Sequence, residues 1–205
     1  MLLRKLWLRM RYGAPVIIVS GLPRSGTSMA MQMLSAGGME VVTDHQREAD
    51  SDNPKGYYEL EQVKTLDKEG DKSWLGEHRN RVVKIISFLL RDLPLNLNYK
   101  VVFMTRDLHE VLASQAKMLQ QRGETDGGPS DEKMRENYRD HLIRTKYFLK
   151  HTPNFSTLFL SHRELLQQPE QGARKLARFL GMEEKTGEMA KVVDSRLYRN
   201  RREAS

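Results

Sequence analysis

The sequence predicts an α/β domain with three layers, in which helices cover both faces of a mostly parallel central sheet. Short apolar segments rich in β-branched residues alternate with longer segments in which apolar residues recur at helical spacing. This alternation is typical of βαβ units and a parallel sheet. The chain has 205 residues, of which 39% are hydrophobic, and this is enough for a domain with an apolar core. Because no repeat or domain-splitting linker is found, a single domain over residues 1–205 is expected.

The first elements are a lead-in segment, a strand and a helix. Residues 1–14 form an amphipathic lead-in, which lacks the apolar stretch and the cleavage site of a secretory signal. The run Val16–Ser20 is apolar and β-branched and ends in a glycine turn, so a buried strand is expected. A helix is expected over Thr27–Ala36, where apolar residues recur at helical spacing, and the pair Gly37 and Gly38 ends it.

The middle of the chain is less regular. Val41 and Val42 are assigned to a short second strand, and the polar, turn-rich residues 43–57 to a loop. A helix is expected over Glu59–Leu66 and a further strand over Val82–Ile86.

The second half returns to a clear alternation. The expected elements are a strand Val101–Thr105, a helix Asp107–Gln121, a loop over 122–132, a helix Lys133–Lys150, a strand over 156–161 and a closing helix Pro169–Leu180. Ligands of parallel sheets bind at the carboxyl ends of the strands. We therefore expect four segments to gather at that edge: 21–28, 87–91, 106–107 and 161–163.

Composition narrows the classes of function. The chain contains no cysteine, which excludes disulfides, cysteine-ligated metals and a thiol nucleophile. No stretch approaches the roughly 18 apolar residues of a membrane span, and a cytoplasmic location is expected. The net charge of +7 points to an anionic ligand, a nucleic acid or a membrane surface. The residues available for contact with a membrane surface are those of the lead-in: Leu2, Leu3, Leu6, Trp7 and Leu8.

The segment "GLPRSGTS", residues 21–28, nearly matches the phosphate-binding pattern G-x-x-x-x-G-K-[ST]. Gly21, Gly26 and Ser28 fit it, but Thr27 stands in place of the lysine. A strand, a glycine-bracketed loop and a helix place backbone N–H groups around an anion. Arg24 lies within the loop and can supply the missing positive charge. The missing lysine weakens an assignment as a nucleoside triphosphatase, in which that lysine reaches the β- and γ-phosphates.

The loop and a second segment resemble sulfotransferases that use 3′-phosphoadenosine 5′-phosphosulfate (PAPS). "PRSGTS" is similar to the family's 5′-phosphosulfate loop, and "VVFMTRDLHEVLASQ" to its strand, arginine and serine signature. Leu108 departs from the family's frequent proline. The tail "TLFLSHRELLQQPEQGARKLARFLGM" also resembles the family, above all its bacterial single-domain members. The resemblance implies a P-loop sulfotransferase-like fold and no metal cofactor. It implies that Arg106 and Ser114 bind the 3′-phosphate of PAPS and that the loop binds its 5′-phosphosulfate, through Pro23, Arg24, Ser25, Gly26, Thr27 and Ser28.

The acceptor of the sulfuryl group needs a base, and Glu59 is the first candidate because "DNPKGYYE" resembles the acceptor-side loop of some bacterial members. Competing candidates for the base are His45, Glu48 and His78. Lys84 is either a cation near the transferring group, with Arg24 and Glu59 in the catalytic set, or a lysine that reaches water. The aromatic residues considered for an acceptor pocket are Tyr57, Tyr58 and Trp74. The basic tail, residues 196–205, either closes over the nucleotide through Arg199 or is solvated; its other arginines are Arg196, Arg201 and Arg202.

Two other classes of function stay open at this stage. A P-loop nucleotide kinase or triphosphatase would need magnesium and ATP, and Thr27 argues against it. A non-catalytic module that binds anions or nucleic acid would explain the positive charge, but the sequence has no recognisable nucleic-acid-reading motif. We therefore expect a PAPS-dependent sulfotransferase that acts on an unknown hydroxyl or amine and has no specific nucleic-acid partner.

Overall fold

A computed structural model of the protein describes residues 2–44, 58–68, 70–121, 123 and 130–193. Its centre is a four-stranded sheet with the strand order β2-β1-β3-β4, and every neighbouring pair is parallel. The strands are β1 (Val16–Gly21), β2 (Val82–Lys84), β3 (Tyr99–Thr105) and β4 (Phe155–Ser161). This confirms the predicted α/β class with a parallel sheet.

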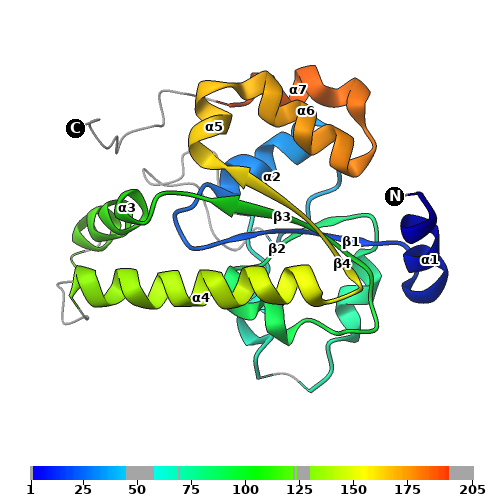
Figure 1. Cartoon of the computed structure of the whole chain (residues 1–205), viewed down its shortest axis with the longest axis horizontal. Coiled ribbons are helices and arrows are strands. Elements are labelled where there is room, and N and C mark those ends of the chain that lie inside the picture. The colour runs from blue at the N-terminus through cyan, green and yellow to red at the C-terminus, as the bar shows by residue number, and fades with distance from the viewer. Residues whose placement is uncertain (1, 45–57, 69, 122, 124–129, 194–205) are drawn as a thin grey trace.

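Helices cover both faces of this sheet and make the three layers visible in Figure 1. One face carries α2 (Thr27–Ala36), α5 (His162–Gln167), α6 (Pro169–Leu180) and α7 (Thr186–Lys191). The other carries α4 (Asp131–His151) and three short 3-10 helices, Glu61–Thr65, Ser73–His78 and Ser87–Asp92. The helix α3 (Leu108–Gln121) follows β3, and a 3-10 turn, Glu183–Lys185, precedes α7.

The side chains of β1 alternate between two separate apolar cores. Val16 and Ile18 belong to the core on the α4 side, whereas Ile17 and Val19 pack with α2, α6 and α7. All six residues of β1 are buried, because a central parallel strand covered on both faces has no solvent-facing side. This burial explains why residues 16–19 of the strand are continuously apolar.

Several boundaries agree with the prediction, and others are corrected. The bounds of α2 and α6 are those predicted, whereas β2 ends at Lys84 instead of Ile86. The segment predicted as a helix from Glu59 contains a 3-10 helix, Glu61–Thr65. Val41 forms only an isolated parallel bridge to Val82 in place of a strand.

The lead-in segment forms a helix, α1 (Leu2–Tyr12). Leu8 is buried against the body, and Arg4 donates hydrogen bonds to the carbonyl oxygens of Pro153 and Phe155. Among the side chains that the structure describes in this helix, four other apolar ones are exposed: Leu3, Leu6, Trp7 and Met10. Among the residues that the structure describes, no helix has the length and apolar character needed to cross a bilayer. Contact of α1 with a membrane surface stays a prediction.

Candidate nucleotide and acceptor site

The carboxyl edge of the sheet brings together three of the four segments that were expected to meet there. Residues 21–28 follow β1, Arg106 follows β3, and His162 follows β4. Direct contacts join them, because Arg106 donates a hydrogen bond to Arg24 and His162 packs on Gly26. The site is therefore built on strand ends, where backbone positions are held by the ladder hydrogen bonds of the sheet.

The loop between β1 and α2 has a backbone that requires glycine at two places. A Cβ atom on Gly21 would lie 2.4 Å from Ser25 Oγ and 2.7 Å from the carbonyl oxygen of Met104. A Cβ atom on Gly26 would lie 2.4 Å from His162 Cδ2, and Gly26 has a φ of 95°. No side chain caps the first turn of α2, so backbone N–H groups of that turn are available to an anion.

Arg24 connects the loop to the second predicted motif. Its Nε donates a hydrogen bond to Ser114 Oγ at 3.0 Å, and its carbonyl oxygen accepts one from Arg106 at 3.0 Å. Arg24 has a φ of 67°, a left-handed conformation that costs a residue with a side chain about 1–2 kcal/mol. The hydrogen bond from Arg106 helps to hold this unfavourable conformation. Residues 82 and 90 positions apart in the sequence thus form one hydrogen-bonded unit.

Arg106 also forms a buried ion pair that the sequence prediction missed. Its Nε lies 3.0 Å from a carboxylate oxygen of Glu110, and the two side chains are only 9% and 5% exposed. The residues are four positions apart at the start of α3, a spacing that brings side chains together on a helix. That spacing after a strand is the signal that would have identified Glu110. The carboxylate orients the guanidinium before any nucleotide is present.

His162 is a second residue that was not singled out, although its segment was expected at this edge. Its ring packs against Gly26 and is buried. Burial and, to a smaller extent, the positive charge of Arg106 lower the pKa of His162 from 6.5 to about 4, and Glu110 opposes the shift. The imidazole is therefore neutral near pH 7 and adds no charge to the loop.

The donors around the loop fit a phosphosulfate group. Ser25 Oγ is buried and has no hydrogen-bond partner among the described residues, and a buried hydroxyl in this state is unusual. Thr27 and Ser28 begin α2 and carry hydroxyl groups, and Pro23 and Arg24 complete the loop. An oxyanion in this loop would meet backbone N–H groups, hydroxyl donors and an arginine, which together suit phosphate or sulfonate oxygens.

On the acceptor side, the structure joins two of the predicted residues. Lys84 Nζ lies 3.7 Å from a carboxylate oxygen of Glu59, and the side chains are 13% and 29% exposed. Lys84 is the last residue of β2 and pairs with Val19 of β1. It therefore lies near the start of the loop, and Glu59 is held next to it.

The remaining acceptor-side candidates divide into two groups. Arg79 pairs with Val16 at the start of β1, so the adjacent His78 lies toward the amino end of the sheet. His78 is thus a poor candidate for the base, and Trp74, which packs edge-on against it, contributes to the core. Tyr58 packs against the core on the α2 side. The others lie outside the described residues: His45, Glu48, Tyr57, Arg196, Arg199, Arg201 and Arg202.

The segment that follows β2 contacts His141, which was not among the residues predicted from the sequence. Ser87 Oγ lies 2.8 Å from His141 Nε2 of α4, and the ring of Phe88 stacks on His141 with the centroids 3.9 Å apart. Burial lowers the pKa of His141, and Arg91 and Arg144 contribute to the same shift. Because Ser87 belongs to the segment 87–91, which was expected at the carboxyl edge, His141 is the next residue to test as a base after Glu59.

Within the described part of the chain, no group of three or more His, Cys, Asp or Glu side chains is arranged to hold a metal ion. The expectation of a reaction without a metal stays a prediction.

Comparison with known proteins identifies a family whose model matches this chain. The family model for the sulfotransferase domain matches residues 14–205. Comparison with curated proteins finds no match. Among solved structures, a sulfotransferase domain from the curacin biosynthetic pathway is 14% identical, with 82% of this chain and 74% of that chain covered and a TM-score of 0.49. A sulfotransferase from Alicyclobacillus acidocaldarius is 12% identical, with 82% and 81% covered and a TM-score of 0.46.

Proposed function

Because the chain belongs to the sulfotransferase domain family, whose members use PAPS, we propose that its carboxyl-edge site transfers the sulfuryl group of PAPS to an acceptor hydroxyl or amine. The observation that carries this proposal is the contact of Arg24 with both Ser114 and Arg106. It joins a loop suited to the 5′-phosphosulfate with a pair suited to the 3′-phosphate. One nucleotide that carries anionic groups at both positions would engage the whole unit.

The loop would stabilise the charge that develops during transfer. The acceptor oxygen or nitrogen forms a bond to sulfur while the bond between sulfur and the bridging phosphate oxygen breaks, so negative charge builds on that oxygen. In this proposal Arg24 and the N–H groups at the start of α2 would lie close to that oxygen, and preorganised donors of this kind lower the barrier. In this proposal the loop residues Pro23 to Ser28 bind the phosphosulfate.

Arg106 and Ser114 would bind the 3′-phosphate. Arg106 is oriented by Glu110, and Ser114 is already hydrogen-bonded to Arg24, so loss of the serine hydroxyl would affect both ends of the nucleotide. Arg199, in the tail, is proposed as a further nucleotide contact. The domain is proposed to extend over residues 1–205.

Glu59 is proposed as the base that removes the proton of the acceptor, with Lys84 as the cation beside it. Their ion pair at the end of β2 supports this pairing. Lys84 would hold the carboxylate in position and offer a positive charge to the transferring group. The two residues would therefore act as a unit, and each substitution is expected to impair the other's contribution.

The function is tested by thermal unfolding of the purified protein with a panel of ligands. We expect adenosine 3′,5′-bisphosphate to raise the melting temperature without magnesium, because a ligand that binds only the folded state stabilises it. Adenosine 5′-phosphate should stabilise less, and Ser114→Ala should reduce this difference. Stabilisation by Mg-ATP alone would identify a nucleotide kinase. A steeply salt-dependent response to oligonucleotides alone would identify a nucleic-acid-binding module.

The role of Glu59 is tested by Glu59→Gln, which keeps the size of the side chain but removes the base. Single-turnover transfer from PAPS should slow strongly, while the affinity for adenosine 3′,5′-bisphosphate stays nearly unchanged. If the glutamine variant transfers at the wild-type rate, Glu59 is not the base. His141→Gln would then be the next variant to measure.

A further inference from the structure

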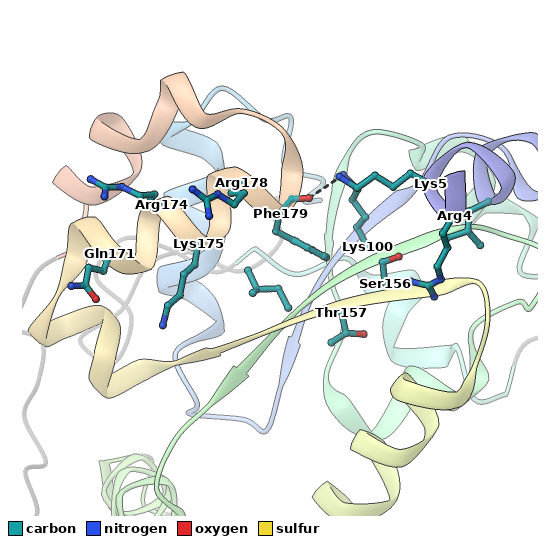
Figure 2. Close-up of a pocket in the computed structure, with 12 residues that line it drawn as sticks. Arg4, Lys5, Lys100, Ser156, Thr157, Gln171, Arg174, Lys175, Arg178 and Phe179 are labelled. Carbon is teal, nitrogen blue, oxygen red and sulfur yellow. Dashed lines mark hydrogen bonds between the residues drawn. The ribbon is translucent and has the colours of Figure 1, made fainter. Parts of the chain in front are cut away.

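A groove of about 680 Å³ lies between α1, β4 and α6. Figure 2 shows Arg4 and Lys5 of α1 on one side, the α6 side chains on the other, and Ser156 and Thr157 of β4 between them. Its apolar lining is formed by Leu8, Leu158 and Phe179. Grooves of roughly 300–1,000 Å³ with apolar linings are the usual size for small-molecule ligands.

Positive charge surrounds this apolar lining. Among the described residues that line the groove, none is an aspartate or glutamate and six are lysines or arginines: Arg4, Lys5, Lys100, Arg174, Lys175 and Arg178.

Most of this charge lacks a compensating carboxylate. Lys175 forms an exposed salt bridge with Glu164, but no described carboxylate forms one with Lys5, Arg174 or Arg178. Lys100 donates to the last carbonyl oxygens of α6. Burial lowers the pKa of Lys100, and the charge of Lys5 lowers it further. These positively charged side chains therefore repel one another, and a bound anion would reduce this repulsion.

The groove is separate from the nucleotide site. Lys100 and Ser156 are paired near the starts of β3 and β4, whereas the nucleotide loop, Arg106 and His162 follow the carboxyl ends of their strands. One wall of the groove is α1, which precedes the residues matched by the family. The groove is thus formed partly by residues that the family model does not match.

We propose that this groove binds an anionic single-chain amphiphile. The hydrocarbon chain of the ligand would lie on Leu8, Leu158 and Phe179, and its acidic headgroup would lie among the lysine and arginine side chains that line the groove. The apolar lining of the groove favours burial of the ligand's methylene groups. Arg174 and Arg178 on α6, with which no described carboxylate pairs, favour a carboxylate, sulfate or phosphate, which each can bind with two hydrogen bonds. The proposal does not depend on the sulfotransferase activity.

A single amphiphile fits these observations better than a membrane surface does. The groove is recessed and has a volume suited to a small molecule. A bilayer presents a broad surface, which cannot enter a groove between two helices. The exposed apolar residues of α1, such as Leu3 and Met10, do not line the groove. A membrane contact would therefore use residues different from those that bind the amphiphile.

The test is calorimetric titration of the full chain with straight-chain carboxylates from hexanoate to dodecanoate, below micelle-forming concentrations. We expect affinity to rise with chain length, by up to about fourfold for each added methylene. Acetate and decyltrimethylammonium are the controls, since one lacks the chain and the other reverses the charge. Neither should bind measurably.

Two variants in the groove and one matched control variant on α4 locate the ligand. The double variant Arg174→Glu with Arg178→Glu should lower the affinity for decanoate at least tenfold. Lys146→Glu with Lys150→Glu changes the net charge equally on two exposed residues with the same spacing on α4, and it should change the affinity less than twofold. Ser156→Phe places a large side chain between the two sides of the groove. It should therefore abolish the dependence of the affinity on the ligand's chain length. Far-UV circular dichroism and a cooperative thermal transition like those of the wild type should be retained in all three, which reports that they are folded.

Three outcomes would overturn the proposal. One is binding of decanoate and decyltrimethylammonium with equal affinity, and another is equal loss in the α4 and α6 variants. The third is binding to vesicles of phosphatidylglycerol without binding to any monomeric carboxylate, which would assign the basic surface to a membrane.

Discussion

Two regions of the molecule gather arginine and lysine side chains, and they hold them in opposite ways. At the carboxyl edge of the sheet, Arg106 is 9% exposed and is bonded to both Glu110 and the backbone of Arg24. In the groove between α1 and α6, Arg174 and Arg178 are exposed, and no described carboxylate pairs with them. Both regions suit anions, but only the first presents its charges in one orientation.

This difference separates a site for chemistry from a site for binding alone. Donors that are already oriented need no rearrangement when charge develops, and this lowers a reaction barrier. Exposed side chains must be ordered by the ligand, which costs conformational entropy and allows several ligands to fit. We therefore expect substitutions at the carboxyl edge to have large effects and those in the groove to have small effects on folding and turnover.

The largest effect on stability is expected from breaking the Arg106–Glu110 pair. Arg106→Met should cost about 3–5 kcal/mol of unfolding free energy, because it leaves a buried carboxylate without this positive charge. The double variant Arg106→Met with Glu110→Leu should recover most of that loss, since two apolar side chains can replace a buried ion pair. Urea unfolding measures both. A single variant as stable as wild type would remove the contrast with the groove.

The next effect concerns turnover. Arg24→Ala should lower sulfuryl transfer about a hundredfold or more, because one preorganised donor is lost. Arg24→Gly provides the control, since glycine accepts the left-handed backbone without strain. If the charge matters, both variants should be equally slow. A glycine variant with near-wild-type turnover would show that Arg24 serves only the shape of the loop.

The third effect is a dependence of stability on pH. The pKa of His162 is about 4 in the folded protein against 6.5 for the ordinary side chain. Between these values the unfolded chain binds more protons, so the unfolding free energy should fall as the pH drops from 6.5 to 4, by at most about 3 kcal/mol. His162→Gln should flatten this slope, whereas the exposed control His151→Gln should not. Equal slopes in wild type and His162→Gln would contradict the assignment.

How far the sequence could predict this site depends on whether a residue's role is local. The bounds of α2 and α6 were predictable because Gly37 and Gly181 end their apolar periodicity. The loop and its arginine were predictable because Gly21 and Gly26 stand five positions apart directly after an apolar strand. Arg106 and Ser114 could be assigned only through resemblance to a family, and their contact with Arg24 spans more than 80 positions.

The parts that were missed depend on tertiary contacts or on signals too short for periodicity. The helix α5 has a capping signal, since Ser161 accepts a hydrogen bond from the N–H of Glu164, but its six residues hold too few turns to show a helical pattern. His162 matters because it packs on Gly26, which no spacing in the sequence reveals. The groove is also a tertiary feature, because its walls come from α1 and α6, at opposite ends of the chain.

The smallest effect is expected in the groove. Lys175 pairs with Glu164 at 3.2 Å, but the two side chains are 54% and 63% exposed. Because solvent screens such pairs, Lys175→Ala should change the unfolding free energy by less than about 1 kcal/mol. Arg174→Ala should change it by no more than about 0.5 kcal/mol, since no described carboxylate loses a partner. Urea unfolding at low and high salt measures both. A loss in either variant as large as that of Arg106→Met would mean that the groove's charges are also built into the fold, and the two regions would then differ in exposure alone.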